Sequence, residues 1–311
     1  MMDKSIHNAF KICSFNSKGH RIDKIDYMKH LLTQCDVLLL QEHWYLERDI
    51  QLLEGLLGNV QVYGVSGMDD NELLSGRPYG GCAIVLSNNL KCNFLPIHIS
   101  NRCCGGVLKL DHISILLFNI YMPCDTLYDY SNLDIFQNIL NDISYTCSEH
   151  EDIDYVIIGG DFNTDLSRMN SLHTQALNNF VQNEELVFCD MSDTADILFT
   201  YENVSSSTES IIDHFIVSEN MYRNLLDYRS IHDGNNLSDH APILLSLNLV
   251  TSREHKCDVR EYTKRPQWDK TTDSNIADYK HALSELFSHI KLPLIMPCTA
   301  RIRLASCIIR I

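Results

Sequence analysis

The 311-residue sequence has no apolar run that approaches the roughly 18 residues a membrane-spanning helix needs. Its first ten residues include Asp3, His7 and Asn8, where a secretory signal peptide would carry a continuous apolar stretch. Integral membrane proteins and secreted proteins are therefore not the expected classes. We expect a protein that is made and kept inside the cell and has no membrane partner.

The sequence also lacks two closely spaced cysteine pairs, which are the usual pattern of a structural zinc site. Its 12 cysteines are scattered along a long chain, and several, such as Cys13 and Cys82, lie inside apolar runs. A disulfide framework is typical of small secreted domains rather than of such a chain. We expect reduced and mostly buried thiols, without structural zinc.

Positive charge is in short supply, with 25 Lys and Arg against 41 Asp and Glu and a net charge of -16. Residues 251–311 hold 11 basic and 7 acidic residues, a balance of +4, so residues 1–250 carry -20. Affinity for DNA comes largely from Lys and Arg, so the acidic body disfavours loose binding to duplex DNA. Some of the carboxylates suit metal ligation, and most are expected to form a solvated surface.

Short β-branched apolar runs alternate with longer amphipathic stretches in the first 250 residues, which indicates an α/β fold. Strands are predicted at 10–15, 36–40, 81–86, 113–120, 155–158, 211–217 and 243–249, and helices at 22–33, 133–145 and 172–182. The stretch from about Val60 to Ile120 indicates consecutive strands. This mixture predicts two mixed β-sheets packed face to face with helices outside, a four-layer α/β sandwich.

A second region is expected at residues 251–311. Residues 251–270 are polar, include Pro266 and follow neither apolar period, which is typical of a linker. Apolar residues then recur on one face of a helix that should end before Pro293; they are Ile276, Tyr279, Leu283, Leu286, Phe287 and Ile290. We predict one domain over 1–250, followed by a linker and helical tail over 251–311.

Polar residues follow or precede several predicted strands, where a side chain can meet solvent while the strand stays buried. They are Asn16 after KICSF, Glu42 after VLLLQ, Tyr121 after LLFNI, Asp161 and Asn163 after VIIGG, and Asp239 with His240 before APILLSL. Side-by-side strands would bring these residues to one edge of the sheets.

These residue types suit metal-assisted hydrolysis of a phosphodiester. Carboxylates such as Glu42 and Asp239 are hard oxygen ligands that Mg²⁺ prefers, and the metal would neutralise charge on the transition state. His240, oriented by Asp213, would stabilise the same phosphate. Asp161 would orient or deprotonate the attacking water.

Taken singly, each residue also has a plainer interpretation. Asn16 is typical of turns, and Glu42 before His43 and Trp44 could be a carboxylate at a helix N-terminus. Tyr121 resembles an ordinary half-buried aromatic at a strand end. Asp213 could be a surface residue at a strand edge, and His240 alone would more often be a hydrogen-bonded structural histidine.

The order of several short sequence motifs along the chain favours the catalytic interpretation, because together these motifs resemble the endonuclease/exonuclease/phosphatase superfamily. The motifs, spread over about 240 residues, are SFNSKG, LLLQEHW, FNIYMP, GGDFN, FTY, IIDHF and LSDHAPI. GDFN and SDH are the specific ones. The resemblance implies a deoxyribonuclease-I-like four-layer fold and a divalent-metal-dependent phosphodiesterase.

Carried over position by position, the resemblance assigns a role to each site residue. It implies that the metal, Mg²⁺ with Mn²⁺ as a substitute, is surrounded by Asn16, Glu42 and Asp239. It implies that Asp161 handles the nucleophilic water, that Asp213 pairs with His240, and that the scissile phosphate meets Tyr121, Asn163 and Thr200.

Within the superfamily, GRPYGG at residues 76–81 and SDHAPI resemble the endonuclease domains of non-LTR (LINE-type) retrotransposons. RPQWDK and IMPC in the tail resemble the connector toward a reverse transcriptase, a domain that this sequence does not contain. His214 departs from the family, where many relatives carry an aromatic residue. A locally basic substrate face would need cations such as those of Lys18, Arg77, Lys109 and Arg168.

The sequence therefore predicts a Mg²⁺-dependent endonuclease that nicks one DNA strand and leaves a 3′-hydroxyl, which in the family primes reverse transcription. DNA is the expected partner, with RNA of the same element as a second one, and the nucleus is then the place of action. A metal-dependent hydrolase of RNA or phosphorylated small molecules and a catalytically silent remnant domain are the alternatives. The oligomeric state is left open.

Overall fold

The computed structural model describes residues 9–19, 21–69, 76–125, 130–203, 205–249 and 251, with scattered residues between 272 and 284. The chain divides into two compact units, Met1–Lys256 and Cys257–Ile311. In the second unit, the backbone is helical at described positions from 274 to 284. The predicted apolar face of this tail helix, apart from Ile276, lies outside the described residues.

The larger of two mixed sheets has the strand order β10-β14-β15-β1-β2-β4-β3 among the described residues. Its strands are β10 (Ala195–Asp196), β14 (Leu225–Ser230), β15 (Ile243–Leu247), β1 (Phe10–Asn16), β2 (Val37–Gln41), β4 (Cys82–Ser87) and β3 (Val60–Val65). β1 pairs in parallel with β2 and antiparallel with β15. Every residue of β2 and β15 is buried, as expected for strands covered on both faces.

The second sheet has the order β5-β6-β7-β8-β13-β9. Its strands are β5 (Asn93–Ser100), β6 (Cys103–Leu110), β7 (Ile113–Tyr121), β8 (Tyr155–Asp161), β13 (Asp213–Ser218) and β9 (Leu186–Phe188). β7 and β8 are parallel, and β13 runs antiparallel to β8. A separate hairpin joins β11 (Tyr201–Asn203) to β12 (Thr208–Ser210).

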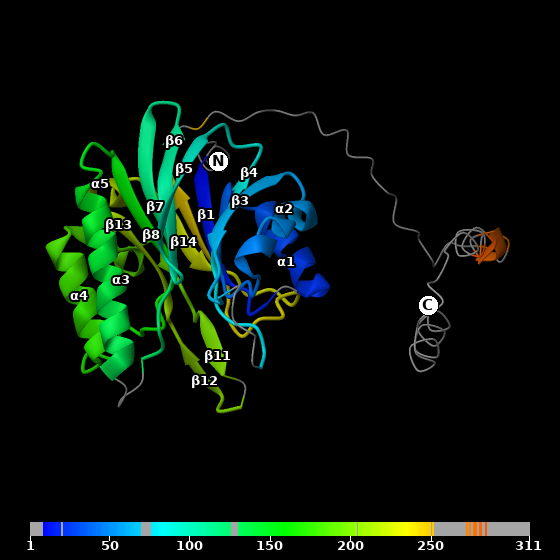
Figure 1. The fold of residues 1–311 in the computed structure, drawn as a ribbon. Coiled ribbons are helices and arrows are strands. Elements are labelled where there is room, and N and C mark those ends of the chain that lie inside the picture. The colour runs from blue at the N-terminus through cyan, green and yellow to red at the C-terminus, as the bar shows by residue number, and fades with distance from the viewer. Residues whose placement is uncertain are drawn as a thin grey trace. The chain divides into compact units, whose positions relative to one another are not determined.

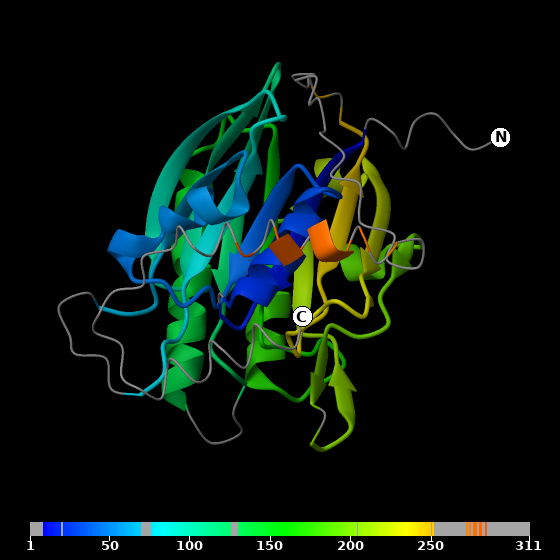
Figure 2. The same cartoon turned by 90° about the vertical axis from the view of Figure 1, so that its right-hand side faces the viewer.

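Helices cover the outer face of each sheet, which gives four layers (Figure 1, Figure 2). α1 (Ile22–Leu32) and α2 (Leu52–Leu57) pack on the larger sheet, and α3 (Tyr130–Ser148) and α4 (Leu172–Asn183) on the other. α4 begins where the Ser171 hydroxyl accepts a hydrogen bond from the Thr174 amide. The shorter helices are η2 (Glu47–Asp49), η3 (Cys189–Met191) and α5 (Glu219–Tyr222).

Three apolar clusters fill the spaces between these layers. The central one lies between the sheets and includes Leu39, Ile84, Leu117 and Phe215. The other two lie under α1 with α2 and under α3 with α4. The predicted four-layer sandwich is therefore confirmed.

Each predicted strand and helix of the first 250 residues is present, with ends shifted by a few residues. β8 continues beyond the predicted stop at Ile158 to Asp161, although Gly159 and Gly160 interrupt its apolar run. Several short elements were not anticipated: α2, α5, β9, β10, β14 and the β11–β12 hairpin, whose polar sequence carries no apolar period.

A buried amide pair links the two sheets. Gln41 Nε2, at the end of β2, donates to Asn119 Oδ1 on β7 at 2.6 Å. Asn119 Nδ2 in turn donates to the carbonyls of Leu40 and Ala83 at 2.9 and 2.8 Å. Hydrogen bonds inside a low-dielectric core are costly to break, so this link fixes how the strand ends of the two sheets face each other.

The nine described cysteines are free thiols, and six of them are buried. Among the described helices, none is both long and apolar enough to cross a lipid bilayer.

Candidate active site

Strand ends from both sheets meet at one edge of the sandwich. β1 ends at Asn16, which pairs with Gln41 at the end of β2, directly before Glu42. In the other sheet, Tyr121 and Asp213 both pair with Asp161. Parallel strands end at the same edge, and the antiparallel β13 begins there, so side chains distant in sequence become neighbours.

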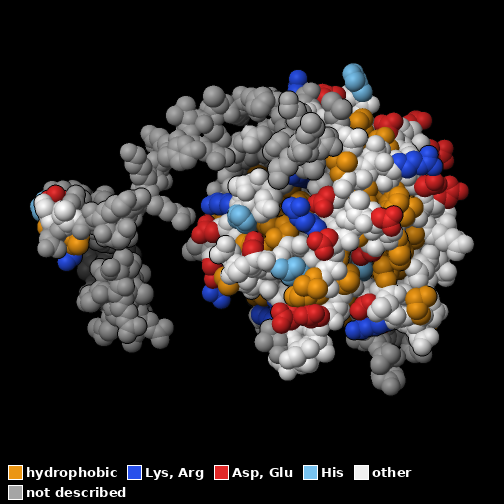
Figure 3. Space-filling model, turned by 180° about the vertical axis from the view of Figure 1, so that it is seen from behind, with side chains coloured by type: hydrophobic (Ala, Val, Ile, Leu, Met, Phe, Trp, Pro, Cys, Tyr) orange, Lys and Arg blue, Asp and Glu red, His pale blue; other side chains and the backbone are white. Residues whose placement is uncertain are grey.

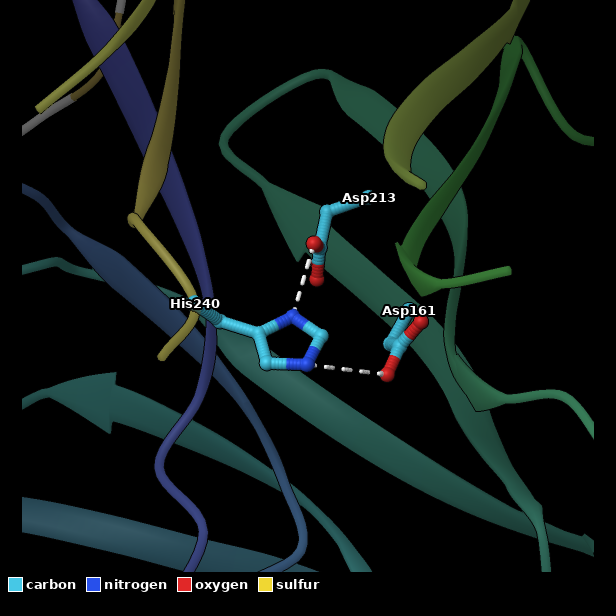
Figure 4. Close-up of side chains that lie close together, drawn as sticks. All are labelled: Asp161, Asp213 and His240. Atoms are coloured by element: carbon cyan, nitrogen blue, oxygen red, sulfur yellow. Dashed lines mark hydrogen bonds and ion pairs between the residues drawn. The ribbon is translucent and has the colours of Figure 1, made fainter. Parts of the chain in front are cut away.

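His240 lies between two aspartates at this edge (Figure 4). Its Nδ1 is 2.9 Å from Asp213 Oδ2, and its Nε2 is 3.8 Å from Asp161 Oδ2. All three side chains are at most 7% exposed. Burial lowers the pKa of His240, but Asp213 and Asp161 outweigh burial and raise that pKa to about 9. The imidazole is therefore a cation at neutral pH, held by Asp213.

Asp161 is placed by contacts on both carboxylate oxygens. Its Oδ2 accepts from Asn16 Nδ2 at 2.9 Å, and its Oδ1 accepts from the backbone N–H of Asn163 at 2.9 Å. Burial, together with Asp213, raises the pKa of Asp161 well above the usual range, while His240 opposes the rise. Such a carboxylate is a better proton acceptor than an exposed aspartate.

Gly160 explains the glycine pair before Asp161. It has φ 149°, and a Cβ at this position would lie 2.1 Å from the Ile120 carbonyl oxygen. β7 and β8 therefore approach each other too closely for any side chain at this point, which is a situation that glycine alone tolerates. This close approach sets Asp161 beside Tyr121.

Glu42 leaves β2 with φ 52° and does not begin a helix, so the helix N-terminal interpretation of this residue is wrong. Its Oε1 accepts from Asn16 Nδ2 at 3.0 Å, and its Oε2 accepts from Trp44 Nε1 at 3.1 Å. Asn16 thus bridges Glu42 and Asp161. The indole of Trp44 is a contact that the sequence did not single out, although it stands two residues away in the word QEHW.

Asp239 meets a cation from the chain itself. Its Oδ2 forms an ion pair with Lys18 Nζ, and its buried Oδ1 has no hydrogen-bond partner. A buried carboxylate oxygen without a partner is costly, which fits a position completed by a bound cation.

The side chains at this edge include donor atoms that a divalent metal prefers. Glu42 and Asp239 supply hard carboxylate oxygens, and the unpartnered Oδ1 of Asp239 supports a cation there. Asn16 Nδ2 faces both carboxylates while its Oδ1 accepts from the Lys18 amide at 3.1 Å, so its ligand role stays a prediction. These residues fit Mg²⁺ or Mn²⁺.

A second set of donor atoms, from Asp161, Asp213 and His240, lies within 4.8 Å of one another. Metal ligation needs a neutral imidazole with a free nitrogen lone pair. His240 is instead protonated and bound to Asp213. This set therefore suits acid–base chemistry, whereas the carboxylates of Glu42 and Asp239 suit a divalent cation.

The three residues predicted to contact phosphate lie around the same edge. Burial makes the largest contribution to raising the pKa of Tyr121, and the negative charge of Glu42 raises this pKa further. Asn163, with φ 49°, donates from Nδ2 to the Met122 carbonyl at 2.8 Å. Thr200 is buried, and its Oγ1 accepts from the amides of Ile212 and Asp213 at 2.9 and 3.0 Å. Thr200 therefore fixes the start of β13, and its phosphate contact stays a prediction.

Arginines stacked on aromatic rings flank the edge. The guanidinium carbon of Arg77 lies 5.7 Å from the Trp44 ring centroid, and that of Arg102 lies 5.2 Å from the Tyr121 ring centroid. Arg102 was missed because only the pairing of β6 with β7 brings it beside Tyr121, through a bond from the Tyr121 amide to its carbonyl.

Of the four cations suggested by the sequence, Lys18 and Arg77 lie at this edge. Lys109 pairs with Ser114, at the end of β6 and β7 opposite to Cys103 and Ile120, so its proposed place on the substrate face is wrong. Arg168 is exposed in the loop after β8. Over the described residues of the face in Figure 3, Lys and Arg side chains lie interspersed with Asp and Glu.

His214 points to the other side of β13. Its Nδ1 is 2.9 Å from Asp190 Oδ1, and its Nε2 is 3.0 Å from the Thr164 carbonyl. Two acceptors require a proton on each ring nitrogen, and although burial opposes it, Asp190 raises the pKa of His214. Through its bond to the Thr164 carbonyl, this imidazolium holds the segment that follows Asp161.

A hollow of about 350 Å³ adjoins the sheet edge that carries His240 and Asp239. It reaches Asp239 and His240 and is bordered by the loop 231–241, Phe199 and Glu202. The rings of Phe199 and His232 pack together there, with 4.4 Å between their centroids.

Comparisons with known proteins agree with this geometry. A family model described as endonuclease-reverse transcriptase matches residues 115–244. Curated protein sequences give no significant match. Among solved structures, the endonuclease domain of TRAS1, a telomere-specific non-LTR retrotransposon, is 14% identical, with a TM-score of 0.58 over 77% of this chain and 98% of that one.

Two further solved structures are similar to the same extent. AP endonuclease LMAP from Leishmania major is 15% identical, with a TM-score of 0.61 over 78% of this chain and 88% of that one. The 3′ phosphatase NExo from Neisseria, bound to a product DNA hairpin, is 17% identical, with a TM-score of 0.58 over 77% and 99%. The matched family model makes this chain similar to endonuclease-reverse transcriptases over residues 115–244, and its four-layer sandwich is the fold of these endonuclease and phosphatase structures.

Proposed function

We propose that this chain is a Mg²⁺-dependent DNA endonuclease that nicks one strand and leaves a 3′-hydroxyl. The observation that carries the proposal is the continuous chain of contacts from Asp213 through His240 and Asp161 to Asn16 and Glu42 at one sheet edge. It joins a buried acid–base group to the hard carboxylate of Glu42, and hydrolysis of a charged phosphodiester requires both kinds of group.

The acid–base group has the parts for attack by water. Asp161, with its raised pKa, orients the water and accepts its proton. His240 Nε2 is 3.8 Å from Asp161, longer than a hydrogen bond, so its N–H is available to an oxygen of the phosphate. Asp213 holds the imidazolium charged and oriented. A metal at Glu42 and Asp239 would add positive charge opposite the leaving oxygen.

The rim of the site supports a nucleic-acid substrate. Arg77 and Arg102 present guanidinium groups beside Trp44 and Tyr121, and Arg is well suited to bind phosphate. The hollow next to His240 offers room for part of a nucleotide beside the scissile bond. A similar structure, the 3′ phosphatase NExo, is described as bound to a product DNA hairpin.

The test is conversion of supercoiled plasmid to open circle by the purified chain in Mg²⁺. We expect nicking by the wild type, its loss with EDTA, and a loss of about 10³-fold in rate for Asp161→Asn and for His240→Gln. Direct extension of the nick by a DNA polymerase, without phosphatase treatment, reports the 3′-hydroxyl.

Matched controls remove the same chemical group elsewhere. Asp152→Asn and His112→Gln change exposed residues in turns remote from the site and should nick like the wild type. A folded wild type that leaves plasmid intact would overturn the proposal of a DNA endonuclease.

A second candidate is a metal-dependent hydrolase of RNA or a phosphorylated small molecule. Glu202 and Glu209 lie directly opposite each other on the exposed β11–β12 hairpin, and Glu202 borders the hollow beside His240. Two carboxylates there would repel a second DNA strand. Cleavage of poly(A) or of an inositol phosphate by a chain that leaves plasmid intact would favour this candidate.

A DNA substrate would make the nucleus the place of action, and RNA of the same genetic element a second partner. Both belong to the proposal. Nuclear accumulation of the tagged full-length chain, measured by microscopy, is the expected result.

A further inference from the structure

Lys18 contacts two of the residues that are predicted to surround the metal, Asp239 and Asn16. Its Nζ forms an ion pair with Asp239 Oδ2, and its backbone amide donates to Asn16 Oδ1 at 3.1 Å. Asp239 Oδ1 is buried without a partner. A carboxylate expected to bind a cation is thus half satisfied by a lysine of the same chain.

The turn that carries Lys18 is held rigidly. The amides of Ser17 and Gly19 donate to the carbonyls of Gln41 and Glu42 at 3.0 and 2.8 Å. Lys24, whose side chain is buried, donates from Nζ to the carbonyls of Ser17 and Lys18 at 2.8 and 2.6 Å. Lys18 itself has φ 47°, a left-handed conformation that costs energy for a non-glycine residue unless the surroundings impose it.

The end of the Lys18 side chain is held much less firmly. The side chain is 37% exposed, and Asp239 Oδ2 is the partner of its ammonium group. A lysine ammonium is a compact point charge on a flexible four-carbon stem, so it can leave one anion for another without movement of the backbone. The structure therefore combines a fixed Cα with an ammonium that can be displaced.

Building on the proposed function, we propose that Lys18 is an internal cation that competes with the divalent metal for Asp239 and, once displaced, binds the substrate phosphate. In the metal-free protein the ammonium neutralises Asp239 within an acidic cluster. A metal that takes Asp239 releases the ammonium beside the catalytic edge, where a phosphate is the anion to bind. Lys18 thereby weakens metal binding and strengthens substrate binding.

This role predicts opposite effects of one substitution. Lys18→Gln removes the competitor, so metal binding should tighten by about 3-fold, within the roughly 1.4- to 5-fold that exposed ion pairs contribute. The same substitution should raise KM for DNA, because the displaced ammonium no longer meets the phosphate. A purely structural role of Lys18 would weaken metal and substrate binding together.

Trp44 provides a direct readout of the metal position, because its indole N–H is bound to Glu42 Oε2 at 3.1 Å. The chain has two tryptophans, Trp44 and Trp268, so the full-length Trp268→Phe variant leaves Trp44 as the single reporter. Titration of this variant with MnCl2 or MgCl2, followed by fluorescence, gives the metal Kd in the absence of DNA.

Two matched variants control for charge and for packing. Arg21→Gln removes one positive charge three residues away, where the guanidinium is 79% exposed and pairs with Asp23, and should leave the metal Kd unchanged. Lys18→Arg keeps the charge and should leave metal binding at the wild-type level. Thermal unfolding of each variant shows whether the fold is retained.

The displacement itself is measurable by amine labelling. Acetylation of Lys18 by a water-soluble active ester, quantified by mass spectrometry against Lys29 as an exposed reference, should rise several-fold when saturating MgCl2 is added. Unchanged or reduced labelling of Lys18 at saturating metal would overturn the proposal.

The outcomes separate this inference from the proposed function. A saturable metal signal in the wild type, with a tighter Kd in Lys18→Gln alone, supports the competition. A saturable signal with an equal or weaker Kd in Lys18→Gln sinks the competition but leaves the metal-dependent nuclease intact. A wild type that shows no saturable metal binding overturns both.

Discussion

The two halves of the active site are held in different ways. The acid–base half, Asp161, Asp213 and His240, is at most 7% exposed; Asp161 and Asp213 face each other on paired strands, and His240 is fixed by an isolated β-bridge with Tyr201. The cation half, Glu42, Asp239 and Lys18, lies on turns, and the Lys18 and Asp239 side chains are 37% and 22% exposed. Under the proposed function, proton transfer would rely on preorganised geometry, whereas ion binding would rely on groups that exchange partners.

The sharpest test of this comparison replaces one aspartate in each half. Asp213→Asn should lower kcat by about 10²- to 10⁴-fold at every Mg²⁺ concentration, because the imidazolium loses its counter-charge. Asp239→Asn should lose a part of its activity that returns when Mg²⁺ is raised, because its defect is in affinity. Plasmid nicking rates over a Mg²⁺ series measure both, and equal metal dependence of the two variants would contradict the division.

A second test breaks the backbone that supports the acid–base half. Gly160→Ala would set a Cβ 2.1 Å from the Ile120 carbonyl, so the free energy of unfolding should fall by about 3 kcal/mol. Gly234, in the loop beside the cation half, has no heavy atom within 4 Å of such a Cβ. Gly234→Ala should change the free energy of unfolding by less than about 0.5 kcal/mol, measured by urea denaturation.

A third test uses pH on the support behind Asp161. The pKa of His214 is raised in the folded state, so the stabilisation it gives is full below the unfolded pKa and is lost as pH rises through the folded pKa. His214→Phe should therefore destabilise by about 2 kcal/mol near pH 6 and by less near pH 10, because the hydrogen bonds to a charged group disappear. Urea unfolding at both pH values checks the sign, and a larger loss at high pH would refute it.

The smallest effect is expected at the rim. Arg102→Gln should raise KM for DNA by about 5-fold and lower the slope of log KM against log salt by about 1, while kcat stays nearly constant. Arg48→Gln is the matched control, because Arg48 is exposed and pairs with Asp49. An unchanged salt slope in Arg102→Gln would remove this arginine from the substrate path.

The local sequence was enough to predict most of the fold. β2, β7 and β15 are nearly continuous apolar runs, and α1 and α4 repeat apolar residues at helical spacing, so burial alone identifies them. The β11–β12 hairpin could not be found in this way, because its residues are polar and exposed and its pairing depends on neighbours. The glycines of β8 hid its last residues for a related reason, since their role is set by the approach of β7.

The same limit applies to the site. Asn16, Glu42, Asp161, Asp213 and His240 could be named from the sequence, because polar residues that interrupt buried runs stand out. Lys109 was misplaced and Arg102 was overlooked, because only the register of β6 against β7 decides which end of this hairpin reaches Tyr121.

The sequence by itself determined which residues are buried, which elements form, and which polar residues stand at strand ends, because hydrophobic periodicity and residue type are local properties. The Asp213–His240 pair was already expected from the sequence, whereas the tertiary structure alone decided that Asn16 bridges Glu42 and Asp161 and that Lys18 reaches Asp239. Hydrogen bonds and ion pairs depend on distances of a few ångströms between groups up to 221 residues apart, and those distances exist only after the sheets have paired and packed.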